Sequence, residues 1–205
     1  MTTNLTDSRT RPPAPPRSSG SRGSGVPRPT IGRLRLRPTR RGRGFIVGVV
    51  DAVGPDTNGF APRDRVAWRD SGQELAELIL IDQDDVLGVP GWVSDEKVVS
   101  YLGAGLIARA LVRTRPFSRG EQVRIESRDT LVAAMTAAWA RSLGADVVDS
   151  ASAEVAIQDD RMARRRGFGS HGRLAQAAVE VFQAIRAGVF DEVPLLAADE
   201  GRLAA

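Results

Sequence analysis

Residues 121–148, EQVRIESRDTLVAAMTAAWARSLGADVV, decide the fold of this chain. Residues 123–125 are typical of a short buried strand, and an alanine-rich helix follows over residues 132–143. Gly144 stands where that helix would end, because glycine tolerates the left-handed backbone found at helix C-termini. A second strand follows at residues 147–148. The stretch therefore predicts the strand–helix–strand opening of a nucleotide-binding βαβ unit.

The first turn of this unit lacks the residues that normally bind a nucleotide. Glycines at that turn let backbone amides approach a pyrophosphate without interference from side chains. The cofactor-binding positions here are Ser127, Arg128, Asp129, Thr130 and Leu131. Side chains at Thr130 and Leu131 would fill the space of the phosphates, and the charge of Asp129 opposes phosphate. We expect a degenerate cofactor turn.

Charge is distributed unevenly along the chain. Residues 1–43 hold 11 of the 29 basic residues but only one of the 25 acidic residues, so the remainder is net acidic. Residues 1–30 are rich in Pro, Ser, Gly and Arg and predict a disordered basic tail, because they cannot bury enough apolar surface to fold. No aromatic residues alternate with these arginines and no recognition fold follows. A nucleic-acid partner is therefore not expected.

The composition argues against a metal site, a membrane span and a signal peptide. The chain has no cysteine and its only histidine is His171, so no metal site is expected. No run of about 18 apolar residues is present, which argues against a membrane span. No signal-peptide pattern is present either, so we expect a cytoplasmic protein without a membrane partner.

The hydrophobic pattern predicts four further strands and two further helices. The strands lie at residues 31–37, 45–53, 65–68 and 75–81. Short strands separated by turns at this spacing predict a small antiparallel barrel or sandwich. One helix is expected from near Glu96 to Val112, and an amphipathic helix over residues 172–187. Residues 151–170 predict an irregular link.

Four stretches of the chain carry the motifs of one known family. They are GVVDAVGPDTNGFAPRDRVAW (48–68), ELAELILID (74–82), VPGWVSDEKVVSYLGAGLIARALVRT (89–114) and GEQVRIES with AAWARSLGADVV (within 120–148). In this order they resemble the medium-chain dehydrogenase/reductase superfamily. In the absence of zinc ligands, the most similar branch is the quinone oxidoreductases, followed by the enoyl reductase domains of polyketide synthases.

The resemblance implies an α+β fold. It consists of a partial GroES-like antiparallel β-barrel, a remnant βαβ of a Rossmann domain and a C-terminal helix. The expected segments are the tail 1–30, a barrel fragment with a linking helix over 31–115, and a truncated Rossmann-like remnant over 116–152. Residues 153–205 then form a linker and a helix that packs back on the barrel.

The departures from the family pattern concern its cofactor and its substrate. Ile107 stands where the resemblance places a threonine near the nicotinamide, and residues 150–156 lack a basic residue for a 2′-phosphate. Arg63 replaces the glycine of the family's GDRV. The block with the substrate-side Asn and Tyr has no counterpart before Gly44, and later cofactor-domain strands are missing between residues 152 and 170.

Three functions remain open at this stage. The resemblance alone implies an NAD(P)H-dependent reductase of quinones or conjugated carbonyls, with NADPH as cofactor if the family activity is retained. The departures favour a degenerate relative without a cofactor. It would be a cofactor-independent cyclase or isomerase of secondary metabolism, or a non-catalytic scaffolding or binding protein. The arginine-rich, lysine-poor composition indicates a bacterial source.

Candidate site residues come from the loops at the strand ends and from the single histidine. Open α/β sheets place ligands at the ends of their strands, which selects Glu126 and Asp129 as catalytic candidates. His171 is the third candidate, because imidazole titrates near neutral pH. A small-molecule substrate and a homodimer are both compatible with the sequence.

Overall fold

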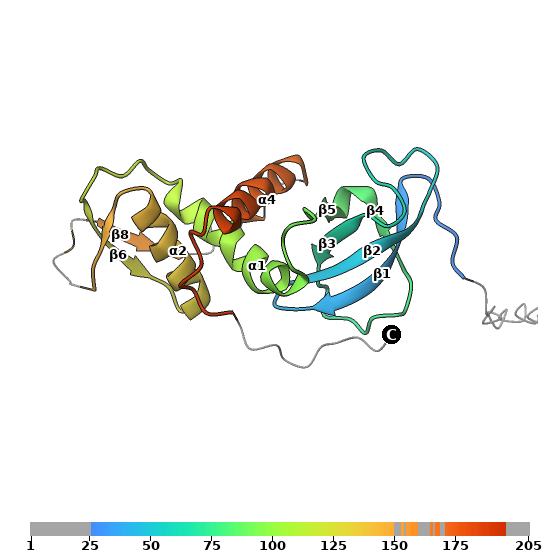
Figure 1. The fold of residues 1–205 in the computed structure, drawn as a ribbon, viewed down its shortest axis with the longest axis horizontal. Coiled ribbons are helices and arrows are strands. Elements are labelled where there is room, and N and C mark those ends of the chain that lie inside the picture. The colour runs from blue at the N-terminus through green and yellow to red at the C-terminus, as the bar shows by residue number, and fades with distance from the viewer. Residues whose placement is uncertain are drawn as a thin grey trace, which may run out of the picture.

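The chain folds into two lobes joined by a central helix, α1 (Asp95–Val112) (Figure 1). The structure is a computed structural model that describes residues 26–149, 153, 155–159, 165, 167, 168 and 171–195. Of the tail predicted over residues 1–30, only residues 26–30 belong to this part, and they form no helix or strand.

The larger lobe is a five-stranded antiparallel sheet in the order β4-β1-β2-β3-β5. Its elements are β1 (Arg33–Arg41), β2 (Phe45–Val53), β3 (Arg65–Arg69), β4 (Ile79–Asp82), the 3-10 helix η1 (Gln83–Asp85) and β5 (Val86–Gly88). The strands β4 and β5 lie at opposite edges of the sheet, yet only η1 separates them in the chain. The sheet therefore has to curl, and it forms a half-barrel.

The two faces of β2 explain how this sheet is covered. Phe45 and Val47 belong to the core shared with α1, whereas Ile46 and Val50 belong to the core inside the curl. This alternation follows from the two-residue period of a strand.

Arg63 occupies a backbone position that suits glycine. Its φ is 80°, and Asp56 is the only other non-glycine residue with a positive φ in the described part of the chain. A left-handed conformation strains a residue with a long side chain. We expect Arg63→Gly to raise the free energy of unfolding by about 1 kcal/mol, because the strain is relieved. Chemical denaturation measures this change. Arg28→Gly, at an exposed position without a positive φ, is the control and should give no gain.

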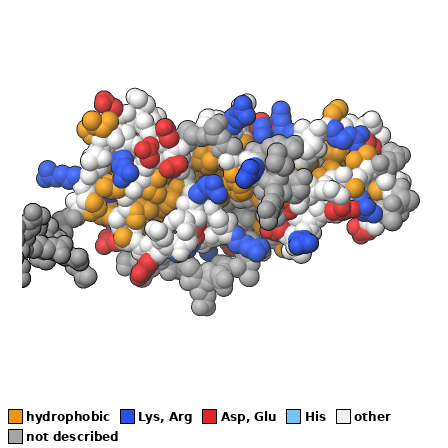
Figure 2. All heavy atoms as spheres, turned by 180° about the vertical axis from the view of Figure 1, so that it is seen from behind, with side chains coloured by type: hydrophobic (Ala, Val, Ile, Leu, Met, Phe, Trp, Pro, Cys, Tyr) orange, Lys and Arg blue, Asp and Glu red, His pale blue; other side chains and the backbone are white. Residues whose placement is uncertain are grey.

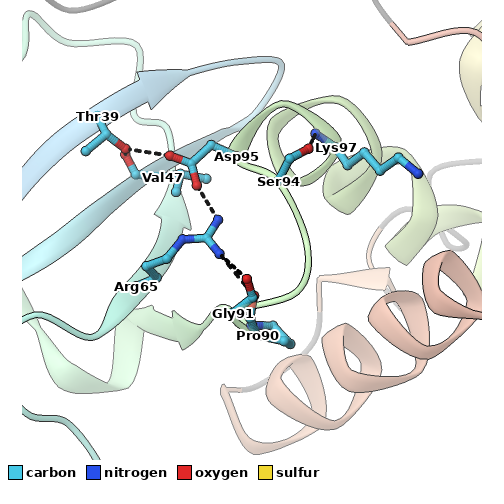
Figure 3. Close-up of polar contacts among 8 residues, drawn as sticks. All are labelled: Thr39, Val47, Arg65, Pro90, Gly91, Ser94, Asp95 and Lys97. Atoms are coloured by element: carbon cyan, nitrogen blue, oxygen red, sulfur yellow. Dashed lines mark hydrogen bonds and ion pairs between the residues drawn. The ribbon is translucent and has the colours of Figure 1, made fainter.

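Polar contacts tie the half-barrel to the start of α1 (Figure 3). Ser94 caps the helix, since its Oγ accepts a hydrogen bond from the backbone N–H of Lys97 at 3.2 Å. The carboxylate of Asp95 accepts hydrogen bonds from the guanidinium of Arg65 and, at 3.0 Å, from the hydroxyl of Thr39. Arg65 also donates to carbonyls of the loop before the helix. Arg65 therefore connects β3 to the start of α1 and to the loop before it.

The smaller lobe contains a parallel sheet of three strands in the order β7-β6-β8. They are β6 (Gln122–Glu126), β7 (Asp146–Val147) and β8 (Val155–Gln158), and α2 (Thr130–Ser142) connects the first two. The predicted βαβ unit is confirmed, with Gly144 at φ 96° just after α2. The prediction of an irregular link over residues 151–170 was wrong at β8, because this four-residue strand is too short to give a clear pattern.

The small sheet is covered on one face and polar on the other. Val123 and Ile157 are buried against α1 and α2. On the opposite face, Arg124 forms an ion pair with Glu126, and Gln158 Nε2 donates to Glu126 at 3.1 Å. Parallel strands that are covered on both faces are usually apolar throughout. The alternating pattern of β6 therefore suits a sheet whose described helices, α1 and α2, lie on one side. The strand that was expected to be buried is buried on one face.

The last helix, α4 (His171–Arg186), packs on α1 and β5. Its buried face carries the residues predicted from the 3.6-residue period, which are Leu174, Ala178, Val181, Phe182 and Ile185. Gly105 of α1 permits the close approach, because a Cβ there would lie 2.7 Å from Cγ1 of Val181. The segment after α4 then crosses to α2 (Figure 1).

These features establish the fold class. A half-barrel, a small parallel sheet with its helix and a C-terminal helix make the predicted α+β fold. None of the helices that the structure describes combines the length and the apolar character needed to cross a bilayer.

Candidate functional site

The centre of the small sheet is a topological switch point. The chain leaves β6 toward β7 on one side, and β8 lies on the other side. In open α/β sheets the crevice at such a point, outside the carboxyl ends of the strands, is where ligands bind. The turn 127–131 after β6 and Asp159 after β8 lie at this position.

Asp129 occupies the place where such a turn would bind a phosphate. It is the N-cap of α2, and its Oδ1 accepts hydrogen bonds from the backbone N–H groups of Leu131 at 3.1 Å and Val132 at 3.3 Å. The free N–H groups of a helix N-terminus are the donors that bind phosphate in dinucleotide sites. Here a carboxylate of the chain itself already takes two of them.

Ser127 links this turn to the end of β8. Its hydroxyl donates to the carboxylate of Asp159 over 2.7 Å and accepts from the backbone N–H of Asp129 at 3.1 Å. The backbone N–H of Asp159 donates to the carbonyl of Glu126 at 2.9 Å. The switch point is therefore closed by contacts between its own polar groups.

The remaining candidate residues do not share one environment at the switch point. Arg128 and Thr130 are exposed, and Leu131 is buried in the core with α1. Glu126 is held by Arg124 and Gln158 on the polar face of the sheet. His171 is the first residue of α4, far along the chain from the turn, and its side chain lies outside the described part.

Asp159 is the polar residue at this point that sequence reasoning missed. Its signal is an acidic residue directly after a short strand, VAIQD, and it was overlooked because β8 itself was not predicted. Glu126, Ser127 and Asp129 are thus brought together with a residue about thirty positions later in the chain.

The residues at the switch point do not fit a nicotinamide dinucleotide. Two N–H groups at the start of α2 are capped by Asp129, and the carboxylates of Asp129 and Asp159 lie together at the ends of the strands. Ile107, at the position where the resemblance places a threonine, is buried with Val123 and Val132 in an apolar cluster and offers no hydroxyl. No step of chemistry is therefore assigned to a nicotinamide here. Among the described side chains, no group of three or more acidic or histidine residues is arranged to hold a metal ion.

Two cavities lie away from the turn. One, of about 630 Å³, lies inside the half-barrel, and the other, of about 650 Å³, lies between α2, β7 and residues 188–193. Neither is lined by a residue of the turn 127–131.

Comparison with known proteins places the fold. No protein-family model matches the sequence, and no curated protein sequence matches it. A quinone oxidoreductase from Pseudomonas syringae pv. Tomato matches with a TM-score of 0.59 and 15% identity, over 80% of this chain and 83% of that chain. A mycobacterial protein complexed with NADPH matches with a TM-score of 0.58 and 18% identity, over the same shares.

A third structure extends the comparison to the enoyl reductase branch. The CurF ER cyclopropanase from the curacin A biosynthetic pathway matches with a TM-score of 0.51 and 15% identity, over 60% of this chain and 47% of that chain. The resemblance found in the sequence motifs is therefore confirmed at the level of the fold. This chain shares the fold of a quinone oxidoreductase.

Proposed function

We propose that this chain is a quinone-oxidoreductase-like protein that has lost nicotinamide-dependent reduction. The observation that carries the proposal is the capping of α2 by Asp129. A pyrophosphate would have to displace this carboxylate from two N–H groups and would then lie beside its negative charge. Both effects weaken dinucleotide binding.

The neighbouring contacts support the same proposal. Asp159 adds a second carboxylate at the switch point, hydrogen-bonded to Ser127 at 2.7 Å. The turn contains no glycine, so its side chains prevent the close backbone approach that a pyrophosphate needs. The polar outer face of the small sheet further suggests that the lobe is adapted to its reduced form.

The role that remains is the binding of a small molecule, without catalysis or with cofactor-independent chemistry. The half-barrel cavity, with its apolar walls and several polar side chains, favours binding. A cofactor-independent cyclase or isomerase is the second candidate. It is favoured by the carboxylates Glu126, Asp129 and Asp159 at the strand ends, where this kind of sheet places its ligands.

Direct titration with NADPH and NADH tests the proposal. We expect no binding heat and no change in nicotinamide fluorescence up to about 1 mM cofactor, which corresponds to a binding free energy weaker than about −4 kcal/mol. Asp129→Ser is the matched variant, because serine keeps an N-cap while it removes the charge. It should also fail to bind, since the turn still lacks glycine.

Two outcomes of the titration would contradict this expectation. Low-micromolar binding of either nucleotide by the unmodified chain would overturn it and restore the reductase assignment. Binding by Asp129→Ser alone would show that the charge of Asp129, rather than the missing glycines, excludes the cofactor.

A further inference from the structure

The cavity inside the half-barrel has apolar walls. It is lined by side chains of the inner core, Ile46, Trp68, Leu75, Ile79 and Ile81. Phe168 and Leu174 line it from the C-terminal part of the chain. Its volume of about 630 Å³ lies within the range of about 300–1,000 Å³ that is usual for small-molecule sites. The apolar walls would take up the hydrocarbon part of a ligand.

Three exposed carboxylates line the same cavity. Glu74 comes from the loop before β4, and Asp84 and Asp85 come from η1. Within the described part of the chain, no arginine or lysine forms a salt bridge with any of the three. The apolar cavity thus carries negative charge that the described residues do not neutralise.

The two other charged groups of the lining are already engaged. Asp70 accepts hydrogen bonds from Arg41 Nε at 2.6 Å and Nη2 at 2.7 Å. Burial acts to raise the pKa of Asp70, but the hydrogen bonds from Arg41 and Gly72 outweigh burial and hold the pKa below its ordinary value. Arg69, the single cation of the lining, lies with its guanidinium 4.7 Å from the ring centroid of Phe168. Among the described residues of the lining, three carboxylates without a salt bridge therefore outnumber the one guanidinium.

We propose that the half-barrel cavity binds an amphiphilic amine, a small molecule with an apolar body and a positively charged nitrogen. The apolar walls would receive the body, and Glu74, Asp84 and Asp85 would attract the charged end. Figure 2 shows hydrophobic side chains at the surface of the five-stranded lobe, on the left of that view, with acidic side chains near them. An anionic ligand of the same shape would meet the three carboxylates and be repelled.

A series of probes that differ only in the head group tests this charge preference. Decyltrimethylammonium, 1-decanol and decanoate are titrated into the full chain, and binding is followed by calorimetry and tryptophan fluorescence. We expect the ammonium to bind at least about tenfold more tightly than decanoate, with decanol between them. Added salt should weaken the binding of the ammonium and leave that of decanol nearly unchanged.

Two variants place the site on the named residues. The triple variant Glu74→Gln, Asp84→Asn, Asp85→Asn should abolish the preference for the ammonium and still bind decanol. The control Asp149→Asn, Glu192→Gln removes two exposed carboxylates that line the other cavity, and it should behave as the unmodified chain. Trp68→Phe should keep the binding heat and lose most of the fluorescence change, because Trp68 lines the cavity.

Three results would overturn the proposal. They are equal affinities for all three probes, an unchanged preference in the triple variant, and a full fluorescence change in Trp68→Phe. These outcomes do not depend on the nicotinamide titration, which probes the other lobe.

Discussion

Replacement of Phe190 by alanine is expected to lower the free energy of unfolding by about 3–5 kcal/mol. The ring of Phe190 is 1% exposed, and its centroid lies 6.0 Å from that of Tyr101 on α1 and 5.5 Å from that of Trp139 on α2. Its removal would leave a cavity between the two helices and detach the segment after α4. Chemical denaturation followed by circular dichroism measures the loss.

A matched control separates this effect from a general sensitivity of the C-terminal segment. Leu195→Ala removes an apolar side chain that is 39% exposed, five residues further along the chain. It should change the stability by less than about 0.5 kcal/mol, as is usual for surface substitutions. If the two variants lost the same stability, the buried cluster would not be the cause.

Glu180→Gln is expected to cost about 1–3 kcal/mol at neutral pH. Glu180 on α4 accepts two hydrogen bonds of 2.7 Å from Arg109 and one of 3.0 Å from Arg113, both on α1. The hydrogen bond from Arg109 lowers the pKa of Glu180 most strongly; burial opposes this shift, and the charges of Arg109 and Arg113 add to it. The variant leaves both guanidinium groups without this carboxylate.

The pH dependence of this cost follows from the lowered pKa. A carboxylate with a lower pKa in the folded state stabilises the protein above its unfolded pKa of about 4.3, and this stability is lost as the pH falls through the folded pKa. The difference between the unmodified chain and Glu180→Gln should therefore be largest near pH 7 and shrink in acid. Glu192→Gln, at an exposed position outside this ion pair, is the control at each pH. A difference that stayed constant from pH 7 to acid would contradict the ion pair.

The sequence was sufficient to predict the helices and strands that have a clear hydrophobic period or end at a glycine or another turn residue. The strand 45–53 is predicted at its observed bounds, because FIVGVVDAV is a β-branched run between turn residues. The end of α2 is predicted because Gly144 tolerates a φ of 96°. The strand β8 was missed because four residues with three apolar side chains do not distinguish a strand from a loop. Pairing with β6 makes it a strand, and this contact is not local in sequence.

The place of the turn 127–131 at the end of β6 was predicted, and the contacts of its side chains were not. Motif order was enough to place the turn 127–131 at the strand end, and its missing glycines were visible. That the carboxylate of Asp129 caps α2 depends on the side-chain direction, which residue type alone does not give. The contact between Ser127 and Asp159 depends on the position of β8, which was not predicted, so the contact could not be predicted either. In both contacts the polar groups of the turn bind one another. The sequence indicated only that the turn lacks glycine.

The ion pair and amide contacts on the outer face of β6 and β8 have a consequence for protein engineering. In the described part of the chain, α1 and α2 cover one face of this small parallel sheet, and polar side chains occupy the other face. Arg124, Glu126 and Gln158 are these side chains. Designers of a small parallel sheet with helices on one face would then place polar residues at the outward positions of each strand and apolar residues at the helix-facing positions. Such a sheet would need no second layer of helices to cover its outer face.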